Sequence, residues 1–121
     1  MDMLSLKSID LGFALVEFGK GYAICRMREG ADLAADHMDN LFKAIEQQID
    51  GTYSIILDDL YPYSMRFEAL IALKKNPRLN RIGVVAYRLV THGVAKMSMH
   101  IVGKHYRVFD NLHEAVDWID T

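Results

Sequence analysis

Two adjacent carboxylates, Asp58 and Asp59, directly follow the apolar run 55–57 and are the most suggestive pair of chemical groups in the chain. Neighbouring side chains of a β-strand point to opposite faces, so these two groups are poorly placed to act together as acid and base. We expect one of them to pair with Arg66 or Arg88, or to cap a turn. No trio of serine or cysteine with histidine and a carboxylate is visible either. The sequence therefore predicts a protein without catalytic residues.

The loop Tyr61-Pro62-Tyr63 has the most unusual local composition in the chain, with Met65 and Phe67 behind it. Tyrosine offers a large contact area for little loss of conformational entropy, so exposed tyrosines suit a binding surface. The alternative is that the same rings close one end of the hydrophobic core. The sequence leaves both interpretations open.

Three basic side chains, His92, Lys96 and His100, recur every four residues on an expected helix. Positions eight apart on a helix are separated by roughly 12 Å, so one ion cannot bridge the two histidines. The ammonium group of Lys96 would also repel a cation. We predict no metal site and no cofactor. This face is interpreted as solvated, or as a surface for an acidic partner or anionic lipid.

The segment 53–87 predicts a parallel βαβ unit, because its two apolar runs, 55–57 and 82–86, are nearly continuous. In open α/β sheets, ligands bind outside the carboxyl ends of the strands. Backbone N–H groups at the starts of the following helices favour an anion there. We predict that a ligand or partner contacts a rim formed by Asp58, Tyr61, Tyr63, Ser64, Arg66, Arg88 and His92.

The remaining elements complete a mixed α/β sheet of about five strands with four helices, in a single domain spanning residues 1–121. An antiparallel hairpin at 12–28 precedes the parallel βαβ units, and its Cys25 is expected in the core. Asp32, Ser64 and Asn111 are expected to cap helices. The helix that begins near Val90 is expected to bury Val90, Val94, Met97 and Ile101.

Composition excludes several classes of protein. A formal charge of −2 and a pI near 6.2 give no reason to expect nucleic-acid binding. The single cysteine allows no intrachain disulfide, and residues 1–10 lack the pattern of a secretory signal, so we expect a cytoplasmic protein. No apolar run is long enough to span a bilayer. We expect a soluble protein that contacts membranes at most peripherally.

At this point the chain resembles the STAS/SpoIIAA-like superfamily, the fold of anti-sigma-factor antagonists, and especially its small uncharacterised bacterial members. The resemblance is carried by the element order, the strand 55–58, Arg66 in the next helix, and the ending 108–119. That ending is similar to the family's Phe-Asp-x-x-x-x-Ala-x-x-Trp-Leu close. The antagonists carry a phosphorylatable serine in an Asp-Ser-Ser-Gly type loop, where this chain has Asp-Asp-Leu-Tyr-Pro-Tyr-Ser. The resemblance thereby makes Ser64 a candidate phosphosite.

Two functions from different classes follow. The preferred one is a noncatalytic regulatory or protein-interaction module, as the resemblance implies. The alternative is the binding or sensing of a small lipophilic or anionic ligand, either in solution or at a membrane surface, and seven methionines and the tyrosine loop suggest the lipophilic ligand. A sizeable apolar cavity would favour the second. A homodimer is also expected, because a short mixed sheet leaves edge strands and apolar helix surface to be covered.

Overall fold

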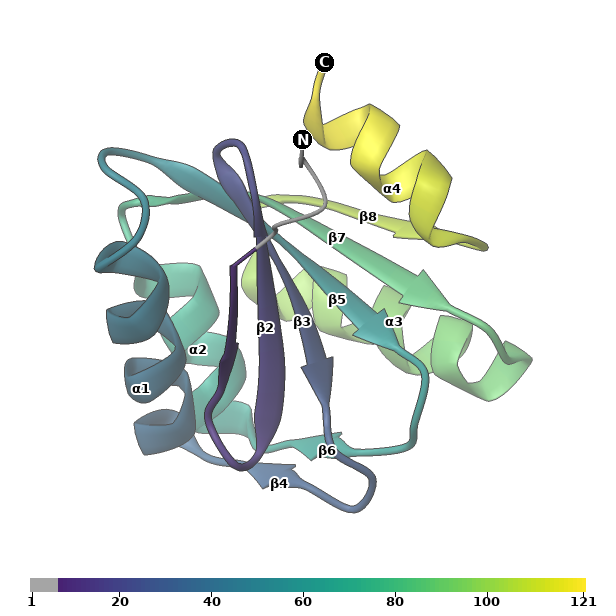
Figure 1. Ribbon diagram of the computed structural model, residues 1–121. Coiled ribbons are helices and arrows are strands. Elements are labelled where there is room, and N and C mark those ends of the chain that lie inside the picture. Colours follow the sequence, from purple (N-terminus) through teal and green to yellow (C-terminus); the bar gives the residue numbers. More distant parts are fainter. Residues whose placement is uncertain (1–6) are drawn as a thin grey trace.

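The centre of the computed structural model, which describes residues 7–121, is a six-stranded mixed sheet in the order β1-β2-β3-β5-β7-β8 (Figure 1). The expectation that residues 1–10 form no secretory signal concerns in part residues 1–6, which lie outside the described residues. The strands of the sheet are β1 (Ser8–Asp10), β2 (Ala14–Gly19), β3 (Tyr22–Met27), β5 (Tyr53–Asp59), β7 (Leu79–Ala86) and β8 (His105–Phe109). The helices are α1 (Ala35–Glu46), α2 (Phe67–Lys75), α3 (Leu89–Val102) and α4 (Leu112–Ile119), and β4 (Asp32–Leu33) pairs with β6 (Ser64–Met65) in a separate ladder.

Strand pairing confirms the predicted fold class. β1, β2 and β3 pair antiparallel, and β3, β5, β7 and β8 pair parallel. Gly21, with a φ of 81°, supplies the left-handed residue of the tight turn between β2 and β3. The sheet has one strand more than the roughly five predicted, because the three residues of β1 are too few to form a recognisable apolar pattern.

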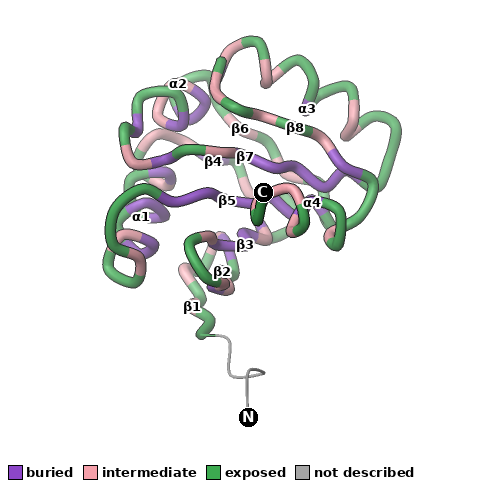
Figure 2. Tube along the Cα trace, turned by 90° about the horizontal axis from the view of Figure 1, so that it is seen from above, coloured by how far each residue is buried: buried purple, intermediate pink, exposed green. Residues whose placement is uncertain are grey.

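The two faces of the sheet carry different helices. α1, α2 and α3 cover one face, where the larger hydrophobic cluster lies, while α4 covers the other (Figures 1 and 2). All seven residues of β5 are buried, as expected for a central parallel strand. The pleat divides them between the faces: Ile55 and Leu57 belong to the larger cluster, and Ile56 packs with α4. Adjacent residues at the end of β5 therefore face different environments.

Two of the expected helix caps are wrong. The structure places Asp32 in β4 and Ser64 in β6, whereas the N-cap residues of α1 and α2 are Ala34 and Arg66. The reason is that these side chains bind each other across the β4–β6 ladder. Ser64 donates a hydrogen bond to Oδ1 of Asp32 at 2.9 Å, and Nε of Arg66 donates to Oδ2 at 3.0 Å. The predicted cap at Asn111 is confirmed, since its side chain accepts a hydrogen bond from the Glu114 N–H at 2.9 Å.

The expected buried stripe of α3 is wrong at three of its four positions. Val90, Val94 and Met97 are 79%, 59% and 71% exposed, whereas Ile101 packs partly buried against the larger cluster, and the helix also buries Ala95 and Val102. Apolar residues occur around most of this helix, so its pattern does not single out one face. In the first part of the helix only the small Ala95 is buried, and the larger apolar side chains there stay exposed.

Cys25 is fully buried in the larger cluster, as predicted. Burial raises the pKa of its thiol to about 12. The thiol therefore stays protonated at neutral pH and behaves as a small core side chain.

Candidate functional site

A cavity of about 370 Å³ lies on the helix-covered face, between the end of β5, the loop that follows it, α2 and α3. We call it the α3 cavity. Most of its lining is apolar or aromatic. The lining residues are Leu57, Asp59, Tyr61, Pro62, Tyr63, Ser64, Met65, Leu70, Val84, Val90, Thr91, Val94, Ala95, Ser98 and Tyr106.

The cavity exists because the segments around it are held apart. After Asp59 the chain crosses to β6, which is tied to β4 rather than to the main sheet. On the other side, α3 reaches the core through the small Ala95 and through Val102 near its end. The start of α3 therefore leaves a hollow in front of Leu70 of α2.

The buried carboxyl group of Asp59 is the main polar group of the cavity. Its residue is only 8% exposed, and its Oδ1 accepts a hydrogen bond from the hydroxyl of Tyr63 at 2.8 Å. Burial and, to a smaller extent, the neighbouring charge of Asp58 raise the pKa of Asp59, while the hydrogen bond from Tyr63 and the charge of Arg88 lower it, and the net pKa is about 7. Near neutral pH this group is therefore divided between its protonated and ionised forms.

Two tyrosine hydroxyls lie close to this carboxyl group. Burial raises the pKa of Tyr63 and of Tyr106, and the charge of Asp59 raises both further. The hydroxyls stay protonated and can both donate and accept hydrogen bonds. Among the residues that the structure describes, no lysine, arginine or histidine lines the cavity. The cavity can therefore enclose an apolar body and hydrogen-bond one polar end.

Asp58 points to the opposite face of the sheet, as the alternation of a strand predicts. It is 3% exposed, and its Oδ2 accepts a hydrogen bond from Nε of Arg26 at 2.8 Å while Oδ1 accepts one from the hydroxyl of Tyr87 at 2.6 Å. Arg26 also pairs with Glu17. The expected pairing with Arg66 or Arg88 is wrong, because the antiparallel hairpin brings Arg26 beside β5. This carboxylate is fully engaged and does not reach the cavity.

The other predicted rim residues are dispersed. Arg66 is paired with Asp32, and Arg88 is exposed just before α3. Nε2 of His92 lies 3.0 Å from Oδ1 of Asp110, which links α3 to the segment before α4. Of the seven predicted residues, the cavity brings together Tyr61, Tyr63 and Ser64.

The two tyrosines of the loop differ in burial, so the core interpretation holds for Tyr63 while the binding interpretation of Tyr61 stays a prediction. Tyr63 packs against the core cluster, whereas Tyr61 is 52% exposed at the cavity. Ser64 lies in β6, two residues before the N-cap Arg66 of α2. A phosphate on its hydroxyl would lie beside both the carboxylate of Asp32 and the guanidinium group of Arg66 that pairs with it, and phosphorylation stays a prediction.

The sequence pointed to Asp59 only as one half of a possible acid–base pair and not as part of the predicted rim, and Tyr106 was missed. The alternation of β5 places Asp59 on the same face as Ile55 and Leu57, and this signal could have directed attention to it. Tyr106 could not have been found in this way. Its place depends on the long-range pairing of β8 with β7.

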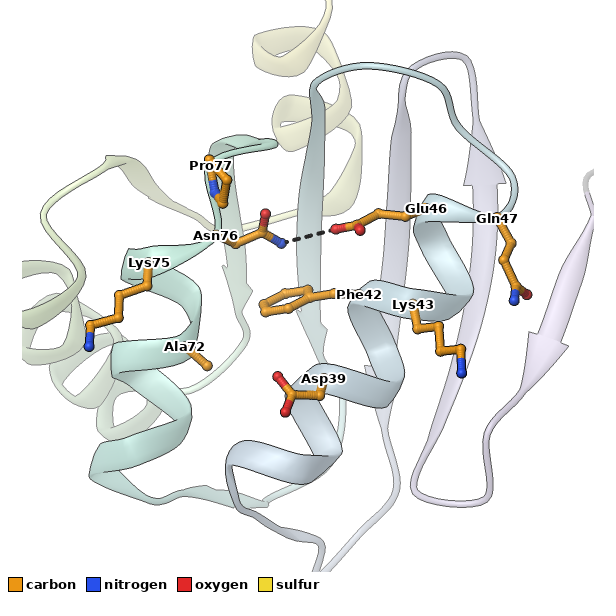
Figure 3. A pocket seen from close by; sticks show the side chains of 9 residues that line it. All are labelled: Asp39, Phe42, Lys43, Glu46, Gln47, Ala72, Lys75, Asn76 and Pro77. Atoms are coloured by element: carbon orange, nitrogen blue, oxygen red, sulfur yellow. Dashed lines mark hydrogen bonds between the residues drawn. The ribbon is translucent and has the colours of Figure 1, made fainter.

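A second hollow, an open groove of about 610 Å³, lies between α1 and α2 (Figure 3). Its buried polar groups bind one another: the Tyr53 hydroxyl donates to Oε2 of Glu46 at 2.8 Å, and Nδ2 of Asn76 donates to the Tyr53 hydroxyl at 2.9 Å. Charged side chains of both signs, including Asp39 and Lys43, surround it in Figure 3. The buried polar groups beside this groove are already hydrogen-bonded to one another, so we take the α3 cavity as the better candidate site.

Within residues 7–121, no group of three His, Cys, Asp or Glu side chains is arranged to hold a metal ion. In the same part of the chain, no helix has the length and apolar character needed to cross a bilayer.

Comparison with known proteins identifies the fold. No protein-family model matches the chain, and no curated protein does. The chain is similar to the crystal structure of an uncharacterised protein of the DUF3478 family from Shewanella loihica, described as having a SpoIIAA-like fold. The TM-score is 0.60 at 10% sequence identity, over 95% of this chain and 92% of that one. The predicted SpoIIAA-like fold is confirmed.

Proposed function

We propose that this SpoIIAA-like domain is a noncatalytic binding module that takes a small, largely apolar ligand into the α3 cavity. The observation that carries the proposal is the cavity itself, with an apolar lining and one buried carboxyl group. Of the two functions that the sequence left open, a sizeable apolar cavity favours ligand binding.

The dimensions of the cavity support this function. Sites for small molecules usually have volumes of roughly 300–1,000 Å³ and combine an apolar lining with a few polar groups that orient the ligand. The α3 cavity, at about 370 Å³, lies near the lower end of this range. Its hydroxyl and carboxyl groups gather around Asp59, so the apolar part of a ligand would lie against Leu70, Val90 and Val94.

Two measurements test the proposal. Native mass spectrometry of freshly purified protein reports any ligand that is carried through purification. Titration with 1-octanol, followed by NMR, reports whether the cavity accepts an apolar chain with one polar end. Saturable shift changes at Leu70 and Val94 are expected. Absence of binding, or shifts confined to the α1–α2 groove, would exclude the proposal.

A second candidate function, a protein-interaction module, is supported by the outer face of α3. Leu89 and Met97 of this helix are more than half exposed, as is Phe67 of α2, and none of the three lines the α3 cavity. Apolar surface gathered in this way is commonly an interaction surface in soluble proteins. The segment Leu89–Val102 also contains no acidic residue, which suits an acidic partner surface. We propose this face as the contact surface of a partner protein, and flotation with anionic vesicles tests whether it contacts a membrane instead.

A further inference from the structure

Only one of the two carboxyl oxygens of Asp59 is hydrogen-bonded among the described residues. Oδ1 accepts the hydrogen bond from Tyr63, and within residues 7–121 no hydrogen-bond partner is found for Oδ2. The group is buried and forms part of the cavity lining. A buried polar atom without a partner is energetically costly, so a ligand that supplies a donor at this place gains free energy by doing so.

The charges around the cavity select among ligands. Arg88 and Asp58 act on Asp59 through their charges, but neither lines the cavity. Since no cationic side chain lines it, the head group of a fatty acid or a phosphate ester would meet a carboxyl group with nothing to neutralise it. An anionic ligand is therefore disfavoured, and a cationic one is favoured.

We propose that the ligand of the α3 cavity is a lipophilic amine, whose ammonium group donates a hydrogen bond to Asp59 while its apolar body lies against Leu70, Val90 and Val94. This inference rests on the proposed ligand-binding function and specifies the head group of the ligand. It also replaces the anion expected from the helix starts at this rim, because the described cavity places a carboxyl group where the anion would lie.

The acceptors around Asp59 match the hydrogen-bonding capacity of an ammonium group. A primary ammonium group has three N–H donors and no acceptor. Oδ2 of Asp59 is free to accept, and the hydroxyl oxygens of Tyr63 and Tyr106 each have lone pairs available for further hydrogen bonds. Tyr63 already donates its proton to Asp59, so toward a ligand its oxygen can act only as an acceptor.

Binding of an ammonium ion must also change the protonation of the site. At neutral pH a part of the population carries a proton on Asp59, since the pKa of this group is about 7. An ammonium ion stabilises the ionised form, so binding to the protonated form releases one proton to solvent. Tyr63 and Tyr106 stay protonated, and Asp58 is paired with Arg26 on the other face of the sheet, so Asp59 is the group whose titration controls binding.

The test compares three ligands with the same chain and different head groups: octylamine, 1-octanol and octanoate. Affinities are measured by isothermal titration calorimetry for the parent protein and for Asp59→Asn. The matched control is Asp39→Asn, which removes a carboxylate from the α1–α2 groove. The parent is expected to bind octylamine about tenfold more tightly than octanol, because charge-assisted hydrogen bonds are roughly twice as strong as neutral ones, and octanoate most weakly.

Asp59→Asn is expected to remove the preference for octylamine and to keep the binding of octanol, while Asp39→Asn leaves all three affinities unchanged. In the parent, octylamine affinity is expected to rise about tenfold per pH unit below the pKa of Asp59 and to level off above it. This pH profile needs no variant, so the inference stays testable if Asp59→Asn folds poorly. Equal affinities for the three ligands, or a preference for octanoate, would overturn the inference and leave the proposed function standing. Failure of all three to bind would overturn both.

Discussion

The hydroxyl of Tyr63 lies 2.8 Å from Oδ1 of Asp59, so the loop after β5 is hydrogen-bonded back to the strand that it leaves. Through this contact Tyr63 holds the loop against the α3 cavity and also hydrogen-bonds one of the two carboxyl oxygens of Asp59. Asp59 itself forms part of the cavity lining.

Replacing Tyr63 with phenylalanine is expected to lower the free energy of unfolding by about 1–3 kcal/mol, since it leaves a buried acceptor without its donor. The loss should be larger above pH 7, where Asp59 is ionised, than in mildly acidic solution. Urea unfolding at the two pH values measures this. Tyr61→Phe is the control, because Tyr61 is exposed. Equal losses for both variants would contradict the assigned role.

Asp59 is expected to make the native protein less stable as the pH rises. Its pKa in the folded protein is about 7 against an ordinary value of 3.8, so the native state holds a proton that the unfolded state has released. The cost of ionising the buried group is absent below pH 3.8, grows through the interval and is complete above pH 7, reaching at most about 4 kcal/mol. Asp59→Asn should therefore gain stability relative to the parent across this interval. Chemical unfolding of both proteins at several pH values measures this gain. If the free energies of unfolding of the parent and of Asp59→Asn differ by the same amount at every pH, the prediction is wrong.

Filling the α3 cavity is expected to block the apolar ligand. Ser98→Phe places a ring beside Tyr106 inside the cavity, so the affinity for 1-octanol should fall at least about tenfold. Lys96→Phe adds the same ring on the exposed side of α3 and serves as the matched control. Calorimetric titration of both variants measures the difference. Unchanged binding by Ser98→Phe would place the ligand elsewhere.

The expected homodimer is predicted to form through the outer face of α3. Met97→Glu puts a charge at the centre of this face and should shift the sedimentation profile toward monomer, because a charge is costly to bury in an apolar interface. Gln48→Glu adds the same charge at an exposed position just after α1 and should leave the profile unchanged. A concentration-independent monomer in the parent protein would show the dimer prediction to be wrong.

Arg26 is expected to matter for stability and not for ligand binding. Replacing it with methionine leaves the buried Asp58 without its cation, which should cost about 2–3 kcal/mol, as Tyr87 still donates to it. Arg28→Met breaks the exposed pair with Asp10 and should change stability little. Urea unfolding and octanol titration of both variants measure the two effects. A large loss of octanol affinity in Arg26→Met would contradict the separation of the two faces.

Much of the fold could be predicted from local patterns. The continuous apolar runs of β5 and β7, the hairpin around Gly21 and the cap at Asn111 each depend on a few consecutive residues. The fates of Asp32 and Ser64 could not be predicted, because each side chain binds a partner about thirty positions away in the chain. Both residue types are good helix caps, but here Asp32 and Ser64 bind each other and so connect two segments that are distant in the chain.

The part of the candidate site that depends on local sequence could be predicted, and the part that depends on long-range packing could not. The loop that carries Tyr61 and Tyr63 could be recognised from its composition, and the strand rule located it at the correct edge of the sheet. The outward turn of Val94 and Met97 could not be read from the sequence, because apolar residues surround α3 and only its packing selects a face. Whether a cavity remains under such a helix depends on that packing.

The order of the main sheet has a consequence for the nascent chain. Each strand of this sheet pairs with the strand of the sheet that precedes it in the sequence. During synthesis, every new strand can therefore pair at once with the edge of the strands already formed. The cover of the second face, in contrast, comes last. Ile56 and Val85 pack against α4, which follows all the strands of the sheet in the chain. Until α4 has been synthesised, this side of the sheet stays uncovered and is the surface that a chaperone would meet.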